Sequence, residues 1–147
     1  MLEPRGARQQ PAPARGGVVS AAVLAVTALA GGVGCALRVL ARDAFLRRGR
    51  NARWATCVIN LSGSLLVGVV AGAVAHRGAG GELPAAAAFG VLAGWTTYSA
   101  FCMDVVLLWI TGRRVHALAL WAVTLAGSAT LAAVGGWFAR SVSGGPA

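Results

Sequence analysis

A polar, flexible segment interrupts the third apolar stretch of this chain, which runs from Leu83 to Thr111. The segment from Gly94 to Phe101 reads GWTTYSAF. Unsatisfied backbone groups in hydrocarbon each cost several kcal/mol, so irregular chain is tolerated in a membrane mainly where it is buried in protein or lines a watery path. We therefore expect a broken helix around a site, where main-chain carbonyls freed near Gly94 face a cation. The alternative is that the hydroxyls of Thr96, Thr97 and Ser99 bond back to carbonyls of their own helix.

A second group of polar side chains lies in the preceding apolar stretch. Thr56, Asn60 and Ser64 follow one another at intervals of four residues, which places them on one helix face. The Asn60 amide can donate two hydrogen bonds, and a row of donors is what an anion needs when it leaves water. The alternative for Asn60 is a hydrogen bond between two helices.

Two aromatic residues follow the interruption at helical spacing. Tyr98 and Phe101 are three residues apart and so share a helix face. Aromatic ring edges carry partial positive charge and can contact a small anion without holding it tightly. The alternative is that both rings pack in a core or face lipid.

One acidic residue, Asp104, falls inside an apolar stretch. An ionisable group at membrane depth is by default a functional hypothesis, and Arg38 is the partner we expect for it. The alternative is a salt bridge or topology anchor near the membrane interface.

Residue patterns typical of enzymes are missing from the sequence. Cys35, Cys57 and Cys102 lie in apolar stretches without CxxC spacing, and His76 and His116 lie beside arginines at the edges of apolar stretches. No nucleophile set, metal-ligand cluster or phosphate loop is present, so we expect no enzyme.

The elements that must position these residues are membrane helices. The chain has 147 residues, of which 57% are hydrophobic and 12% charged, and its mean hydropathy is +0.71. Four apolar stretches, at about 18–39, 54–75, 85–110 and 115–139, each approach the ~20 residues that a spanning helix needs. We predict an all-α integral membrane domain over 18–140, with four transmembrane helices of which the third is broken in mid-membrane.

The two ends of the chain are predicted to lie outside this domain. Residues 1–17 are rich in Pro, Arg and Gln and are expected to form a disordered basic tail, and 141–147 a short second tail. The basic start followed by Ala28-Leu29-Ala30 is similar to a cleavable signal peptide. Because the apolar run continues to Leu40, we interpret it as a spanning helix instead.

All thirteen basic residues are arginine, and the formal charge is +9. Most arginines flank the apolar stretches, which favours headgroup anchoring over nucleic-acid binding. One side would carry five arginines and the other seven, with Arg38 at its edge, which is a weak bias under the positive-inside rule. Insertion in both orientations and assembly into a dimer are therefore expected.

Three sequence stretches together resemble a known family. They read GGVGCALR (residues 31–38), TCVINLSG (56–63) and GVLAGWTTYSAF (90–101), in this order and at suitable separations. With the four apolar stretches, they resemble the Fluc fluoride channels, also called CrcB proteins. The resemblance covers nearly all of the chain after the first tail.

The resemblance implies an antiparallel, dual-topology dimer of four-helix subunits, as a homodimer or as a heterodimer with a related subunit. It implies two fluoride pores and a structural Na⁺ ion, not transported, on the twofold axis. By this similarity Asn60 lines a pore, Tyr98 and Phe101 occupy the two Phe-box positions, and Ser128 belongs to a polar track on the fourth span. Tyr98 stands where the family has a phenylalanine.

Other residues carry further implications of the resemblance. The sodium ion would be held by the main-chain carbonyls of Ala93 and Thr96, and Ala93 stands where the family has a glycine. Ala100 stands where the family often has a threonine. Arg38 and Asp104 match the family's arginine at the end of span one and its acid in span three.

The function implied is a passive channel in the plasma membrane that lets cytoplasmic fluoride leave the cell. An interior-negative potential would drive the anion outward by about 2.3 kcal/mol per 100 mV, so no coupling residue is required. Two alternatives stay open. A small dual-topology multidrug exporter would need a membrane carboxylate, for which Asp104 is the sole candidate, and a structural partner subunit would conduct nothing.

Overall fold

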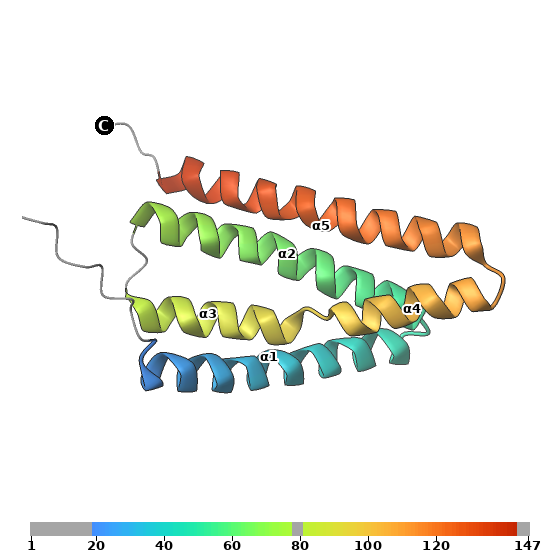
Figure 1. Cartoon of the computed structure of the whole chain (residues 1–147), viewed down its shortest axis with the longest axis horizontal. Helices are drawn as coiled ribbons and strands as arrows, with labels where there is room; N and C mark the ends of the chain where they lie inside the picture. Colours follow the sequence, from blue (N-terminus) through green and yellow to red (C-terminus); the bar gives the residue numbers. More distant parts are fainter. Residues whose placement is uncertain (1–18, 78–80, 144–147) are drawn as a thin grey trace, which may run out of the picture.

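A computed structural model describes residues 19–77 and 81–143 of the chain, and this part is entirely helical apart from short connections. Its helices are α1 (Ala21–Arg47), α2 (Ala52–Arg77), α3 (Glu82–Trp95), α4 (Tyr98–Ile110) and α5 (Arg114–Ser143). They form an elongated bundle in which α3 and α4 follow one another end to end and the others lie alongside them (Figure 1). The predicted tail over 1–17 and the last four residues lie outside the described residues.

Four segments of the described chain are long and apolar enough to cross a membrane. They are α1, α2, α5 and the combined segment from Glu82 to Ile110 that contains α3 and α4. The predicted class of an all-helical membrane protein with four spans is therefore confirmed. α1 continues to Arg47, well past the end of the first apolar stretch at about residue 39, and α5 continues past Arg140 to Ser143.

The third segment changes conformation at two residues. α3 ends at Trp95, Thr96 and Thr97 have extended backbones (ψ 155° and 113°), and α4 begins at Tyr98. The Thr97 hydroxyl accepts a hydrogen bond from the Ala100 amide at 3.3 Å and so caps the new helix. α3 and α4 are therefore two separately terminated helices (Figure 1).

The helices pack in two close pairs, of which the first is α1 with α3. Glycine makes this approach possible: a Cβ at Gly34 would collide with the Val91 carbonyl, and one at Gly94 with the Gly31 carbonyl. α1 and α3 thus touch backbone to backbone.

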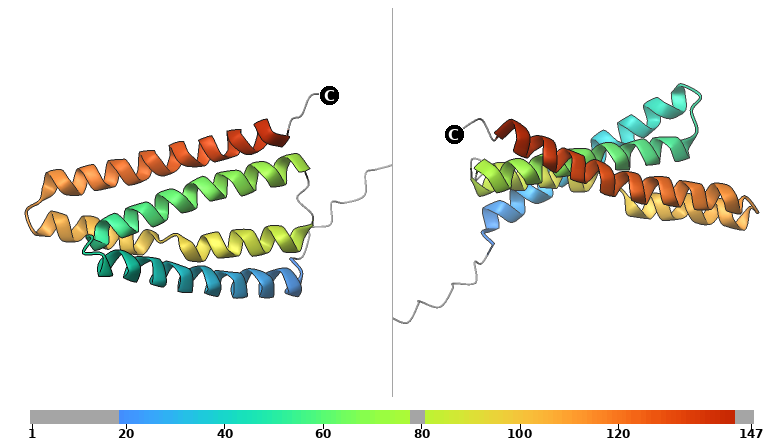
Figure 2. Two further views of the ribbon diagram at one scale, coloured as in Figure 1. Left: turned by 180° about the vertical axis from the view of Figure 1, so that it is seen from behind. Right: turned by 90° about the horizontal axis from the view of Figure 1, so that it is seen from above.

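The second close pair is α2 with α5, and it is built in the same way. A Cβ at Gly68 would collide with the Ala132 carbonyl, and one at Gly135 with the Leu65 carbonyl. The right-hand view in Figure 2 shows that the end of α1 and the start of α2 diverge from α4 and the start of α5 at one end of the bundle.

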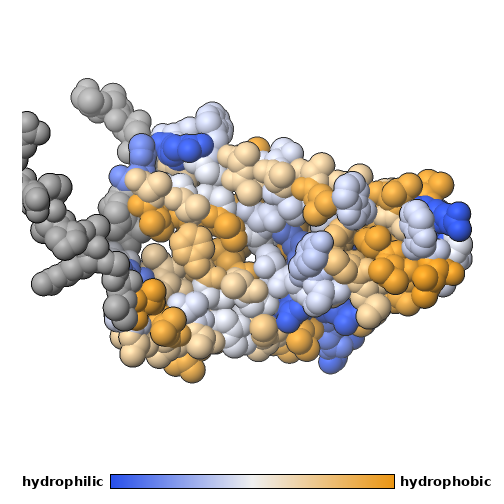
Figure 3. All heavy atoms as spheres, viewed as in Figure 1, coloured by the Kyte–Doolittle hydropathy of each residue, from blue (hydrophilic) through white to orange (hydrophobic). Residues whose placement is uncertain are grey.

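Among the described residues, more arginines lie at one end of the bundle than at the other. The end where α1 meets α2 and α4 meets α5 carries seven described arginines, Arg42, Arg47, Arg48, Arg50, Arg53, Arg113 and Arg114. Arg140 lies toward the opposite end of α5, where α1 begins and α2 finishes (Figure 1). Much of the length between the ends is covered by apolar side chains (Figure 3).

Candidate functional site

A cleft of about 340 Å³ lies between α2, the start of α4 and α5, beside the break in the third segment. It brings together five of the six side chains that the sequence proposed for an anion path, which are Asn60, Ser64, Tyr98, Phe101 and Ser128. Its other lining residues are Val67, Thr96, Thr97, Thr124, Leu125 and Ala132. Residues from three separate sequence regions therefore meet at one place.

Asn60 connects the cleft to the break. This side chain is 8% exposed; its Nδ2 donates to the Thr97 carbonyl at 3.0 Å, and its Oδ1 accepts from the Thr97 amide at 2.8 Å. In a continuous helix the Thr97 amide would donate to the Ala93 carbonyl instead. Asn60 thus stabilises the extended backbone, and its second Nδ2 hydrogen is left for another acceptor. The alternative considered for Asn60 was a hydrogen bond to another helical segment. Asn60 forms such bonds, to the connection between α3 and α4, and it also lines the cleft.

The hydroxyl groups around the cleft differ in how they are bonded. Within the described residues, the hydroxyls of Ser64 and Ser128 have no hydrogen-bond partner. The Thr124 hydroxyl is 3.6 Å from Cys57 Sγ and its residue is 3% exposed. Ser64 and Ser128 are therefore the hydroxyls available to a bound anion.

One sequence candidate lies apart from the cleft, and one hydroxyl residue of α5 lines the cleft although it was not proposed from the sequence. Thr56 is 3% exposed, and its hydroxyl donates to the Ala52 carbonyl at 3.2 Å. Thr124 lines the cleft although only Ser128 was proposed on that helix. Thr124 precedes Ser128 by four residues, so the two share a helix face, and this spacing could have identified Thr124 from the sequence.

The two aromatic rings border the cleft in different environments. Phe101 is 3% exposed, whereas Tyr98 is 73% exposed. Their ring centroids are 5.9 Å apart and the planes are tilted by 47°. Phe101 therefore belongs to the inner wall, and Tyr98 stands at the open side.

The end of α3 is held by a second set of contacts from α2 that the sequence did not predict. Trp95 Nε1 donates to the Ser62 hydroxyl at 3.1 Å, and that hydroxyl donates to the Ile59 carbonyl at 3.0 Å. Gly63 lies against the side chains of Trp95 and Thr96. Ser62 and Asn60 together anchor both sides of the break to α2.

The two carbonyls proposed for a cation belong to residues at this anchored break. Ala93 is exposed in the last turn of α3, and Thr96 is half-buried in the extended connection. The amide that would bond the Ala93 carbonyl in a longer helix donates to Asn60 instead. The Ala93 carbonyl is therefore without that helical donor, which suits an oxygen ligand for a hard cation.

Arg38 and Asp104, which were expected to pair, do not form an ion pair among the described residues of this single subunit. Arg38 Nη2 lies 3.6 Å from Cys35 Sγ, and its buried Nε has no hydrogen-bond partner in the structure. The ion pair found among the described residues joins Arg47 to Asp43 at 2.7 Å. These two residues are four positions apart on α1, and helical geometry alone places side chains at this spacing next to each other.

The cleft continues toward one end of the bundle. A neighbouring hollow of about 360 Å³ shares Val67 and Ala132 with it and extends between α2 and α5 to Arg140. The rest of its wall consists of small residues, namely Gly68, Ala71, Gly72, Ala75, Ala133 and Gly136. Small side chains on both helices thus leave an open groove from the break to the Arg140 end.

Comparison with known proteins gives a family match and named relatives. The family model described as "CrcB-like protein, Camphor Resistance (CrcB)" matches residues 25–137. A "Fluoride-specific ion channel FluC" from Novosphingobium aromaticivorans is 40% identical over 126 residues, which cover 84% of this chain and 97% of the relative. Proteins of the same name from Chelativorans sp. and Mesorhizobium japonicum are 36% and 33% identical, each over 81% of this chain and 97% of the relative.

Proposed function

Since this chain belongs to the CrcB-like family of membrane proteins, we propose that it is a passive fluoride-selective channel in the plasma membrane. The relatives are named as ion channels, which confirms the expectation that the protein is not an enzyme. Four apolar helices agree with a multi-pass membrane protein.

The observation that carries the proposal is the composition of the cleft. Fluoride is small and strongly hydrated, so a pore must replace its water with donors that hold it weakly enough for release. The free Nδ2 hydrogen of Asn60 and the hydroxyls of Ser64 and Ser128 supply such donors. Phe101 and Tyr98 add ring edges with partial positive charge. No carboxylate lines the cleft among the described residues, as suits an anion path.

The proposed working unit is an antiparallel dual-topology homodimer. In one subunit the cleft is open on one side and Tyr98 at its edge is 73% exposed, so a pore wall is incomplete. A second subunit laid against this face would close each cleft and cover the tyrosine. Two clefts then give two pores, which is the arrangement implied by the family resemblance.

A structural sodium ion is proposed at the centre of this dimer. Two subunits related by a twofold axis would each supply the carbonyls of Ala93 and Thr96, and such oxygens are suitable ligands for a hard cation. The exposed Ala93 and the anchored break support this location. Bound there, the ion would supply positive charge that holds the two breaks together.

The direction of transport follows from passive conduction. Hydrogen fluoride enters cells unaided and dissociates at neutral pH, and the interior-negative potential then drives the anion outward by about 2.3 kcal/mol per 100 mV. The exporter alternative has little support, because Asp104, its sole candidate carboxylate, does not line the cleft.

The test is fluoride efflux from liposomes that contain only this chain. With sodium present, we expect rapid fluoride release and no chloride release above that of empty liposomes. Removal of sodium should reduce the release. A chain that is dimeric by cross-linking yet releases no fluoride with sodium present would contradict the proposal and support a non-conducting subunit.

A further inference from the structure

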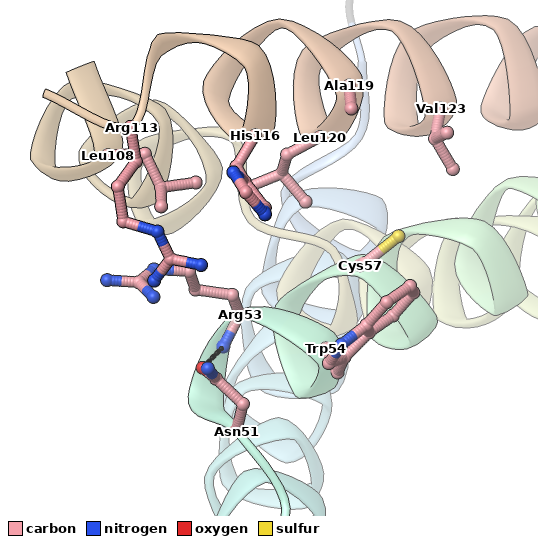
Figure 4. Close-up of a pocket in the computed structure, with 10 residues that line it drawn as sticks. All are labelled: Asn51, Arg53, Trp54, Cys57, Leu108, Arg113, His116, Ala119, Leu120 and Val123. Atoms are coloured by element: carbon pink, nitrogen blue, oxygen red, sulfur yellow. Dashed lines mark hydrogen bonds between the residues drawn. The ribbon is translucent and has the colours of Figure 1, made fainter.

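A second cleft, of about 200 Å³, lies where the start of α2 faces the end of α4 and the start of α5 (Figure 4). It is lined by Asn51, Arg53, Trp54, Cys57, Leu108, Arg113, His116, Ala119, Leu120 and Val123. None of these residues lines the cleft between α2, the start of α4 and α5 that we propose for fluoride, called the fluoride cleft below. Its occupant must therefore be argued from its own chemistry.

The mouth of this second cleft is strongly basic. Arg53 and Arg113 reach toward each other across it, and the ring of His116 points into it (Figure 4). Arg53 lies in the first turn of α2 and Arg113 directly precedes α5, so the positive ends of two helix dipoles add to the two guanidinium charges. Within the described residues, neither guanidinium forms a hydrogen bond or an ion pair, and no carboxylate lines the cleft.

The floor of the second cleft is apolar. Cys57 and Leu108 are buried at 2% and 3% exposure, and Leu120 and Val123 extend the wall along α5. Trp54 stands beside the mouth, and tryptophan is enriched at the level of lipid headgroups. We therefore expect the basic mouth at headgroup level, with the apolar floor on its membrane side. A charged mouth above an apolar floor suits an amphiphile better than a hydrated ion.

We propose that the second cleft binds one phospholipid with an anionic headgroup. The phosphate lies between Arg53 and Arg113, which supply N–H donors and neutralising charge. The upper part of an acyl chain follows the wall formed by Cys57, Leu120 and Val123. Because the cleft opens at the end of the bundle where seven arginines gather, anionic lipid is also concentrated around it.

The test measures lipid retained by the purified full-length protein, by native mass spectrometry during titration with phosphatidylglycerol, phosphatidylcholine or inorganic phosphate. Arg53→Gln with Arg113→Gln should weaken phosphatidylglycerol binding by roughly thirtyfold. Arg42→Gln with Arg48→Gln removes equal charge from exposed residues at the same end and should change it by less than about threefold. Ala119→Trp fills the apolar wall and should weaken phosphatidylglycerol binding without removing charge.

Three outcomes would overturn the proposal. Equal retention of phosphatidylglycerol and phosphatidylcholine would exclude headgroup recognition. Equal losses in the two double variants would show that general surface charge attracts the lipid. Inorganic phosphate bound as tightly as phosphatidylglycerol, in wild type and in Ala119→Trp alike, would identify a free-anion site.

Discussion

Asn60 is the residue on which the site depends, because one amide group serves two purposes. It replaces the helical hydrogen bond of Thr97 and keeps one N–H at the wall of the cleft that we propose as the fluoride path. Spacing in the sequence predicted that Asn60 and Ser64 share a face. Spacing did not predict the Thr97 partner, since 37 residues separate it from Asn60 and only tertiary packing brings them together.

Asn60→Asp tests this role with little change in size. A carboxylate in the cleft would repel fluoride, so we expect efflux from liposomes to fall by at least about a hundredfold. Ser141→Asp, which adds the same charge at an exposed position near the end of α5, should leave efflux within about twofold. Unchanged efflux in Asn60→Asp would place the anion path elsewhere.

Tyr98 stands where the family resemblance implies a phenylalanine, and two variants separate the contribution of its ring from that of its hydroxyl. Tyr98→Phe keeps the ring edge, and we expect fluoride efflux within about twofold of wild type. Tyr98→Leu removes that edge and should lower efflux by roughly five- to tenfold. Similar efflux in the two variants would show that the aromatic edge contributes nothing.

At the scale of elements, the sequence predicted the number and class of the helices better than their ends. Hydropathy marks the length of chain in hydrocarbon, whereas α1 continues as a helix beyond it, helped by the Arg47–Asp43 pair. Gly94 was expected to be the point of opening, yet it remains helical and packs against the Gly31 carbonyl. α3 ends just before Thr97, whose amide donates to Asn60 instead of to a helical carbonyl. Asn60 lies on another helix, so the sequence of the third segment alone does not predict this end.

Gly34→Ala tests the close pairing of α1 with α3. The new methyl group would collide with the Val91 carbonyl, so we expect a destabilisation of about 1–3 kcal/mol and a lower temperature of thermal unfolding in detergent. Gly32→Ala is the matched control, because a Cβ there meets nothing within 4 Å. Equal unfolding temperatures for the two variants would disprove the backbone contact.

Ser62→Ala tests the anchoring of α3. Loss of the acceptor for Trp95 Nε1 should cost about 1 kcal/mol, and if the proposed sodium ligands are held by this contact, half-maximal efflux should need about fivefold more sodium. Ser62→Thr restores the hydroxyl and should restore the sodium response. An unchanged sodium response in Ser62→Ala would limit Ser62 to a packing role.

At the scale of the whole molecule, the open cleft and the uneven arginines bear on assembly. The structure places seven arginines at one end, as the sequence predicted from its connections. It describes a single subunit, so the dual-topology dimer rests on the open fluoride cleft and on the family resemblance. A subunit's sequence patterns specify its own helices far more directly than the surface of a partner.

Orientation can be measured with a cysteine introduced at an exposed position. For Ser141→Cys in intact cells, a membrane-impermeant maleimide should label roughly half of the chains, and the rest only after permeabilisation. The wild-type chain gives the background from its own cysteines. Complete labelling, or none, in intact cells would show a single orientation and contradict the dual-topology homodimer.

The break between α3 and α4 has a consequence for gating. Interrupted helices often serve as hinges, but here Thr97 is bonded on both sides by Asn60, Trp95 is tied to Ser62, and the Thr97 hydroxyl caps α4. With these hydrogen bonds in place, α3 and α4 have little freedom to change their angle at the break. We therefore expect the interruption to be a fixed bend rather than a gate in the proposed channel.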